Sequence, residues 1–137
     1  MPKIFIILMF AGTQFGKAEE AIHFYTSLFK NSEIMNIEYF EAEEPGGKEG
    51  TVKHATFTIA GKEYMAYDSS VEHKFTSTPS ISIYVNCESE EEIDWLYQKI
   101  SDGGGVMMPL GDYGFSKKFG WLTDKYGFSW QLNLAEN

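Results

Sequence analysis

The stretch SISIYVNCESEEEIDWLYQKI, residues Ser80–Ile100, contains a strand signal followed directly by a helix signal. Polar and apolar side chains alternate over Ser80–Val85, which is the period of a β-strand. Ser89 and Glu92 have the spacing of a capping box, in which both side chains satisfy free N–H groups at a helix start. The helix continues with apolar residues at helical spacing: Ile93, Leu96, Tyr97 and Ile100. This stretch therefore predicts one strand and one capped helix.

Three further strands are expected after this helix. The glycines Gly103–Gly105 end the helix, because glycine readily adopts the backbone conformation that terminates one. Candidate strands follow at Val106–Leu110, Phe115–Thr123 and Phe128–Leu134. The second half of the chain therefore has the order strand, helix and three strands.

The first half shows the same order of signals. Ile4–Phe10 is a continuous apolar run, which predicts a strand buried on both faces. Apolar residues at helical spacing predict an amphipathic helix from about Lys17 to Lys30. The strand candidates that follow are Ile34–Phe40, Lys53–Ile59 and Glu63–Asp68, with the acidic turn or flexible loop EAEEPGGKEG between the first two. The order βαβββ thus occurs twice, and we expect an α+β fold.

Length and composition restrict the class of protein. We expect one domain over residues 1–137, with module one at about 1–70, a linker at 69–79 and module two at about 80–137. The formal charge of −9 argues against a nucleic-acid partner, because phosphate binding needs a basic surface. The single cysteine, Cys87, fits a reducing compartment. The apolar run after Lys3 resembles a short signal peptide, but a buried first strand explains it better, so we expect a cytoplasmic protein without a membrane partner.

Several stretches resemble a known family. They are LMFAGTQFGKAEEAIHFYTSLF, HATFTIAGKEYMAYDSS, TPSISIYVNCESEEEIDWLYQKIS and MPLGDYGFSKKFGWLTDKYGFSWQLNL. Together with the βαβββ duplication, they resemble the vicinal oxygen chelate superfamily, and most closely its PhnB-like branch, also called demethylubiquinone methyltransferase-like. The resemblance implies two modules whose curved mixed sheets surround a cavity, and it implies a homodimer. Metal-binding members carry His or Glu on the first and last strand of each module.

This chain departs from that metal pattern. The resemblance places the final-strand glutamate of metal-binding members at Gln131, whose neutral amide is a much weaker ligand. It places a histidine of those members near Ser80, where this chain has serine. The opening strand IFIILMF has neither histidine nor carboxylate, which leaves Glu63 in the fourth strand. We therefore predict no typical metal site and no cofactor. A methyltransferase activity is not supported either, because Gly103–Gly105 follows a helix, whereas a Rossmann-type glycine turn follows a strand.

Three histidines and one cysteine need separate interpretation. We expect His23 to be solvated on its helix, and His54 to be either a strand-edge residue bonded to backbone or a pocket residue. His73, in the linker, is either a lid contact or a surface residue. An atypical metal site of His54, His73 and an acid such as Glu63 or Asp68 stays open as an alternative. Cys87 precedes a run of carboxylates that would raise the pKa of its thiol, so we expect a small buried residue rather than a nucleophile.

Strand alternation selects the candidate ligand-binding residues. Ser80, Ser82, Tyr84 and Asn86 share one strand face, and Ser129, Gln131 and Asn133 share another. Because sheets bury their apolar face against helices, these polar faces should line the cavity. The segment GDYGFSKKFGW adds aromatic residues near its mouth, with a core or dimer interface as the alternative. The predicted ligand-binding residues are Gln131, Ser82, Tyr84, His54, Tyr113, Phe115 and Trp121.

These residues favour binding of a small organic molecule without a typical metal. The first alternative is a metal-dependent lyase, isomerase or dioxygenase with an atypical ligand set. The second is a subunit of an assembly, in which side chains fill the cavity. The residues do not decide whether the protein is an enzyme, because a fold does not determine chemistry.

Overall fold

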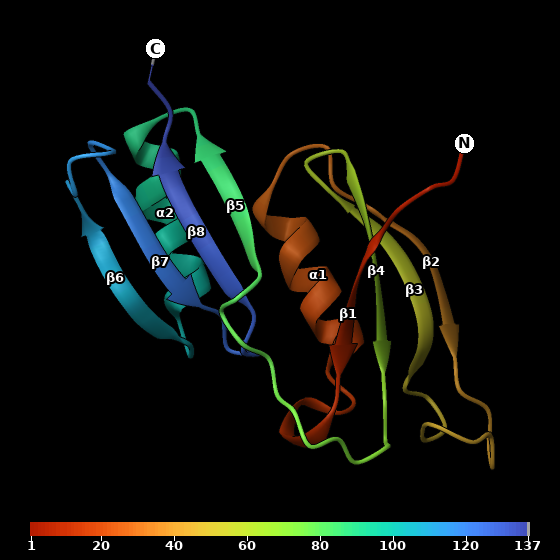
Figure 1. Cartoon of the computed structure of the whole chain (residues 1–137). Coiled ribbons are helices and arrows are strands. Elements are labelled where there is room, and N and C mark those ends of the chain that lie inside the picture. The colour runs from red at the N-terminus through yellow and green to blue at the C-terminus, as the bar shows by residue number, and fades with distance from the viewer. Residues whose placement is uncertain (137) are drawn as a thin grey trace. The chain divides into compact units, whose positions relative to one another are not determined.

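The computed structural model describes residues 1–136, and the first half of the chain forms a four-stranded sheet with one long helix. Its elements are β1 (Ile6–Phe10), the 3-10 turn η1 (Gly12–Gln14), α1 (Ala18–Leu28), β2 (Ile34–Tyr39), β3 (Val52–Ile59) and β4 (Lys62–Asp68). The strand order is β1-β4-β3-β2. β1 runs parallel to β4, and the other neighbours are antiparallel, so the sheet is mixed (Figure 1).

The second half repeats this arrangement. Its elements are β5 (Ser82–Cys87), α2 (Glu90–Ser101), β6 (Gly105–Gly111), β7 (Phe119–Thr123) and β8 (Ser129–Leu134). The strand order is β5-β8-β7-β6, again with its first strand parallel to its last. The chain divides into two compact units, Met1–Lys74 and Phe75–Asn137. The predicted α+β fold of two βαβββ modules with mixed sheets is confirmed.

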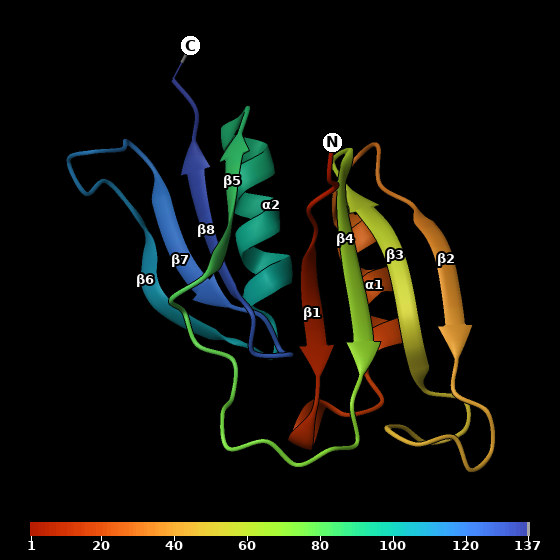
Figure 2. The same cartoon turned by 45° about the vertical axis from the view of Figure 1, so that its right-hand side comes forward.

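One helix covers one face of each sheet and leaves the other face open (Figures 1 and 2). In the first module, α1 buries Ile22 and Tyr25 against the sheet, where Phe10 and Phe57 are also buried. In the second, α2 is capped as expected: the Ser89 hydroxyl accepts from Glu92 N, while the Glu92 carboxylate accepts from Glu88 N. Its buried residues Ile93, Leu96 and Ile100 pack on the sheet, where Trp130 and Leu132 of β8 are also buried. Neither helix of the described chain is long and apolar enough to cross a bilayer.

The first strand differs from the prediction. Ile6 is 42% exposed and Ile7 49% exposed, so β1 is not buried on both faces. The reason is its position at the edge of the sheet, where only β4 pairs with it. The later part of the strand, with Leu8 and Phe10, does enter the core.

Two element boundaries also differ. β5 begins at Ser82 rather than Ser80, and the Ser80 hydroxyl lies 2.7 Å from that of Thr78 in the preceding connection. β7 begins at Phe119 rather than Phe115. The connection before it turns back on itself, because Tyr113 N donates to Ser116 O over 3.3 Å.

The acidic connection between β2 and β3 closes around one aromatic ring. Phe40 is buried, its N–H donates to Thr51 O, and its carbonyl accepts from Gly50 N. A Cβ on Gly47 would lie 2.1 Å from the Phe40 ring, so only glycine fits there. The loop is therefore held by a specific packing contact.

A buried aspartate fixes the backbone in each module. Asp68, at the end of β4, accepts from Gly16 N and Ala18 N at the start of α1 and from Val52 N at the start of β3. Burial raises the pKa of Asp68, and the three backbone donors act against this rise. The carboxylate thus ties together three segments that are far apart in sequence.

Asp124 has the corresponding role in the β7–β8 turn. One carboxylate oxygen accepts from Tyr126 N at 2.9 Å and Phe128 N at 3.1 Å. The other accepts from the buried Trp130 indole at 2.9 Å. The turn DKYG and the first part of the last strand are therefore organised around a single carboxylate, which is itself only 2% exposed.

Candidate functional site

The open face of the second sheet carries the polar side chains selected from the sequence. Strand register groups them in three rows across β5, β8 and β7. The rows are Ser82–Ser129–Thr123, Tyr84–Gln131–Trp121 and Asn86–Asn133–Phe119. Trp130 and Leu132, the alternate residues of β8, are buried on the opposite, helix-covered side. None of the side chains in the three rows carries a formal charge.

Four of these side chains form a hydrogen-bonded cluster, which we call the serine–glutamine cluster. Gln131 Nε2 donates to Ser82 Oγ over 3.2 Å. The hydroxyls of Ser82 and Ser129 lie 2.6 Å apart, and Trp121 Nε1 donates to Ser129 Oγ over 2.8 Å. Ser82, Gln131 and Trp121 remain partly exposed, whereas Ser129 is 3% exposed. The cluster thus has polar atoms at the surface, and the buried Ser129 hydroxyl connects Ser82 and Trp121 from below.

Aromatic side chains surround the other end of this face. Phe119 is 4% exposed, and its ring centroid lies 5.0 Å from that of Phe115 and 6.3 Å from that of Tyr113. Tyr84 approaches the same ring from β5, with centroids 6.4 Å apart. Tyr113 is held by a 2.6 Å hydrogen bond from its hydroxyl to Pro109 O. Tyr84, Tyr113 and Phe115 stay exposed, so they offer ring surface to a ligand.

The two loop lysines do not supply a free positive charge to this cluster. Lys118 Nζ lies 2.7 Å from Asp94 Oδ1 on α2. This hydrogen bond to Asp94 is the main reason that the pKa of Lys118 is raised, so its cation is retained in that pair. Lys117 lines a hollow at the end of β8 together with Leu134, Ala135 and Glu136, and that hollow contains no member of the serine–glutamine cluster.

The predicted site residues fall in both compact units. Ser82, Tyr84, Tyr113, Phe115, Trp121 and Gln131 all lie in the second unit. His54 lies in the first, on the open face of that sheet with Thr56 and Thr58, where its register partner is Glu38. The structure therefore brings six of the seven candidates to one module.

The residues of the alternative metal site point to different places. Asp68 is buried and accepts three backbone hydrogen bonds, so it is not on the open face with His54. Glu63 is on that face but lies 3.5 Å from Lys3 Nζ. His73 Nε2 lies 3.3 Å from Ser69 Oγ. Over residues 1–136, no three or more His, Cys, Asp or Glu side chains form a group that could hold a metal ion.

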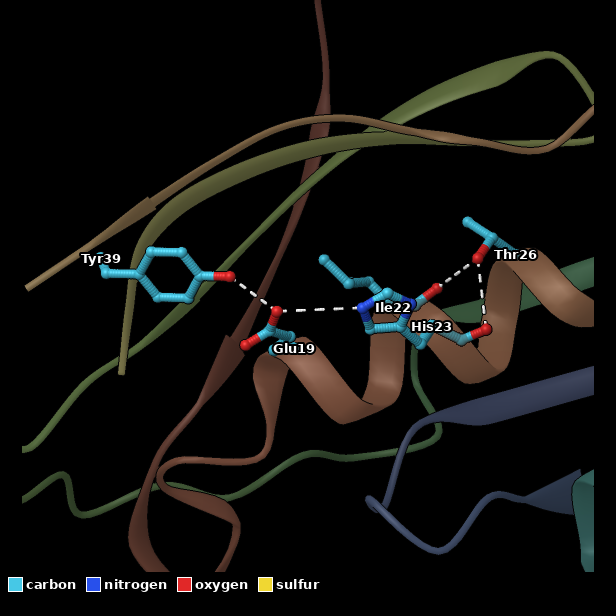
Figure 3. Close-up of polar contacts among 5 residues, drawn as sticks. All are labelled: Glu19, Ile22, His23, Thr26 and Tyr39. Carbon is cyan, nitrogen blue, oxygen red and sulfur yellow. Dashed lines mark hydrogen bonds and ion pairs between the residues drawn. The ribbon is translucent and has the colours of Figure 1, made fainter. Parts of the chain in front are cut away.

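His23 is solvated on α1, as expected, but it has a carboxylate neighbour. Its Nε2 lies 3.8 Å from Glu19 Oε2, and its side chain is 64% exposed. The same oxygen accepts a 2.6 Å hydrogen bond from the Tyr39 hydroxyl of β2 (Figure 3). Glu19 therefore links the solvent side of α1 to the edge strand β2 within the first unit.

Cys87 is fully buried at the end of β5. Burial, with a smaller effect of the Glu92 carboxylate, raises the pKa of its thiol to about 12. The thiol is therefore neutral near pH 7 and is a poor nucleophile. Its interpretation as a small buried residue agrees with the structure.

Comparison with known proteins now identifies the family. A family model described as 3-demethylubiquinone-9 3-methyltransferase matches residues 2–133. The chain belongs to this family. A solved PhnB protein from Bacillus cereus is 59% identical to our PhnB-like chain, with 98% of this chain and 100% of that one covered and a TM-score of 0.91. No curated protein matches this chain.

More distant structures share the fold of this PhnB-like protein. Protein PA1353 from Pseudomonas aeruginosa is 24% identical over 98% of this chain and 100% of that one, with a TM-score of 0.79. A mutant of the fosfomycin resistance protein FosX from Listeria monocytogenes, complexed with Mn(II) and 1S,2S-dihydroxypropylphosphonic acid, is 14% identical. The alignment covers 98% of this chain and 93% of the FosX chain, and the TM-score is 0.64. The resemblance to PhnB-like proteins is confirmed by the family model and the PhnB structure, and these distant structures show a shared fold.

The residues of this PhnB-like protein do not fit the metal that the fold implies. On the first and last strands of the second module, Ser82 and Gln131 lie together and hydrogen-bond to each other. A neutral hydroxyl and a neutral amide are weak ligands compared with imidazole and carboxylate. On the corresponding strands of the first module, Glu63 of β4 is the carboxylate on the open face, whereas β1 consists of IILMF. The fit fails on the chemistry of these side chains.

Strand alternation identified the polar faces, but two partners are missing from the predicted ligand-binding residues. They are Ser129, whose hydroxyl connects Ser82 to Trp121, and Phe119, around which the loop aromatics pack. Alternation put both on strand faces, but their partners depend on strand register. Gln131 contacts Ser82, which lies two positions before Tyr84, the register partner of Gln131 on β5.

Proposed function

We propose that this PhnB-like protein binds a small organic molecule on the open face of the second sheet without a bound metal ion. The observation that supports this most directly is the serine–glutamine cluster, which places hydrogen-bonding atoms beside exposed aromatic rings. A few fixed polar groups next to aromatic surface are what a pocket for an organic ligand needs. Gln131, Ser82 and Tyr84 position the polar part of the ligand, and Trp121 and Phe115 contact its rings.

The decisive test is a binding screen with matched tryptophan variants. Neutral bicyclic aromatic compounds such as quinoline are titrated into the protein, and the Trp121 indole N–H resonance is followed by NMR. At ten times the dissociation constant, a ligand stabilises the folded state by about 1.4 kcal/mol, which raises the melting temperature by roughly 4 °C. Measured by the melting shift, Trp121→Leu should lose the stabilisation by the ligand, while Trp95→Leu should keep it, because Trp95 lies on α2 next to Lys99.

A metal assay separates this proposal from a metal-dependent reaction. Untagged protein is analysed for bound elements and melted with Mn, Fe, Ni and Zn salts. We expect no stoichiometric metal and no melting shift. Near-stoichiometric metal that is lost in His54→Ala or His73→Ala would refute the metal-free mode, whereas the absence of any bicyclic ligand would refute small-molecule binding.

We also propose that the protein is a cytoplasmic homodimer. Exposed apolar side chains on the edge strand β1 and just before β5, among them Ile6, Ile7 and Ile81, support an interface with another chain. The buried, neutral Cys87 fits a reducing compartment. Light scattering at micromolar concentration measures the mass, and a monomer would contradict the dimer.

A further inference from the structure

The serine–glutamine cluster contains an unequal distribution of hydrogen-bond donors and acceptors. Each serine hydroxyl has one hydrogen and two lone pairs, whereas the Gln131 amide has two N–H groups and one carbonyl oxygen. Ser129 Oγ accepts from Trp121 Nε1 and shares one hydrogen with Ser82 Oγ. Ser82 Oγ also accepts from Gln131 Nε2. The direction of the hydrogen between the two serines decides which group remains available to a ligand.

Burial selects one direction. If Ser82 donated to Ser129, the Ser129 hydrogen would need another acceptor at a position only 3% exposed. A buried donor without a partner is unfavourable, so Ser129 donates to Ser82 instead. Ser82 Oγ then accepts from both Ser129 and Gln131, and its own hydrogen points toward the open face. Ser82 is therefore the outward donor of the cluster.

Gln131 supplies the matching acceptor. Its Nε2 donates to Ser82, while its Oε1 accepts no hydrogen bond from the described residues. The outward hydroxyl of Ser82 and the carbonyl oxygen of Gln131 are thus adjacent. Tyr84 and Trp121, the register partners of Gln131, lie on either side of it. The acceptor thus lies in the row between two residues with flat rings, and the donor lies beside it in the neighbouring row.

We propose that this site recognises neutral, planar molecules in which a carbonyl group is next to an N–H group, as in a lactam or a cis amide. The ligand carbonyl accepts from Ser82, its N–H donates to Gln131 Oε1, and its ring lies between Tyr84 and Trp121. This ligand class rests on the proposed function. A neutral ligand is favoured over an anion, because the three rows carry no charge and Lys118 is paired with Asp94.

The test compares three bicyclic probes of similar shape. 2-Quinolinone has both the carbonyl and the N–H group, N-methyl-2-quinolinone keeps only the carbonyl, and quinoline has neither the carbonyl nor the N–H. Dissociation constants are measured by NMR titration of the Trp121 indole resonance. We expect 2-quinolinone to bind about tenfold more tightly than either comparison compound, since each neutral hydrogen bond is worth roughly two- to tenfold. Quinoline controls for the added bulk of the methyl group.

Variants assign the preference to the two side chains. Ser82→Ala should weaken 2-quinolinone binding about fivefold, and Gln131→Met, which keeps the side-chain length, should bring 2-quinolinone and N-methyl-2-quinolinone within about twofold of each other. Thr56→Val, on the open face of the first sheet, should leave the three constants unchanged. Amide NMR spectra check that each variant is folded.

The outcomes separate the two proposals. Equal affinity of the three probes for the unmodified protein would overturn the ligand class but not small-molecule binding. A preference for 2-quinolinone that survives both Ser82→Ala and Gln131→Met would also overturn it, because the preference would arise elsewhere. If no probe in the panel moved the Trp121 resonance, both the ligand class and the proposed function would fail.

Discussion

The two modules have the same framework but different open faces. In the first, the open side of β3 and β4 carries threonines, Met65, Tyr67, His54 and Glu63. In the second, the corresponding strands carry serines, amides and aromatic rings that are joined by hydrogen bonds. The two modules thus share one strand order, while the exposed sides of their sheets differ in chemistry.

The buried sides show what the modules share. Each uses an aspartate that accepts three hydrogen bonds and holds separate pieces of backbone, Asp68 in the first module and Asp124 in the second. The two do not occupy equivalent positions, because Asp68 is the last residue of β4 whereas Asp124 precedes β8. The same physical solution therefore serves different connections, and its loss should affect stability rather than binding.

The largest effect is expected for Asp124→Ala. The change leaves two backbone N–H groups and the Trp130 indole N–H without their acceptor in a buried site. Unfolding by urea should show a loss of about 3 to 5 kcal/mol, and Asp68→Ala should cost a similar amount.

Asp112→Ala is the matched control for these variants. Asp112 is exposed and accepts one backbone hydrogen bond, from Gly114 N. Its loss should cost less than about 1 kcal/mol, because water replaces the carboxylate. If Asp124→Ala were as mild as Asp112→Ala, the idea that a buried carboxylate holds each module together would be wrong.

A smaller effect is expected where α2 passes into β6. A Cβ at Gly104 would lie 2.0 Å from Thr123 O and 2.8 Å from the carbonyl carbon of Asp124. Gly104→Ala must therefore move backbone, and we expect a loss of about 2 kcal/mol in urea unfolding. Gly111→Ala is the control, since a Cβ at Gly111 would lie 3.8 Å from its nearest neighbour, the Tyr113 ring, which is an ordinary contact distance. Equal stability of the two variants would show that this connection is not tightly packed.

The repeated order of elements was predictable because its signals are local. The capping box at Ser89 and the helical spacing of Ile93 and Leu96 lie within a few residues of each other, and the structure confirms both. The exposure of β1 was not predictable. An apolar run does not reveal whether its strand lies at the edge of a sheet.

The site was predictable as a face but not as a set of contacts. Alternation placed Gln131 and Ser82 on polar faces, yet their contact joins residues that are 49 positions apart. Asp68 shows the same limit. From its residue type it was a candidate metal ligand, whereas in the structure its oxygens accept hydrogen bonds from backbone N–H groups 52, 50 and 16 positions away. Register and long-range pairing determine both roles, and neither is encoded in local spacing.

The smallest effect concerns a contact between helix and edge strand in the first module, the hydrogen bond from Tyr39 to Glu19 in Figure 3. The hydrogen bond to this carboxylate, with desolvation and the charge of Glu19, raises the pKa of Tyr39. The protonated phenol is therefore favoured more in the folded than in the unfolded state. Its contribution is fully present below the unfolded pKa of about 10 and is lost as the pH rises through the folded value.

Tyr39→Phe should consequently lower the free energy of unfolding by less than about 1 kcal/mol at pH 7, because solvent screens this exposed pair. The difference between the two proteins should shrink above pH 10, as the phenol of the unmodified protein ionises. Tyr113→Phe is the control, since its hydroxyl donates to the neutral carbonyl of Pro109 rather than to a carboxylate. A Tyr39→Phe difference that stayed constant from pH 7 to pH 11 would mean that the phenol contributes packing alone and that Glu19 does not stabilise its proton.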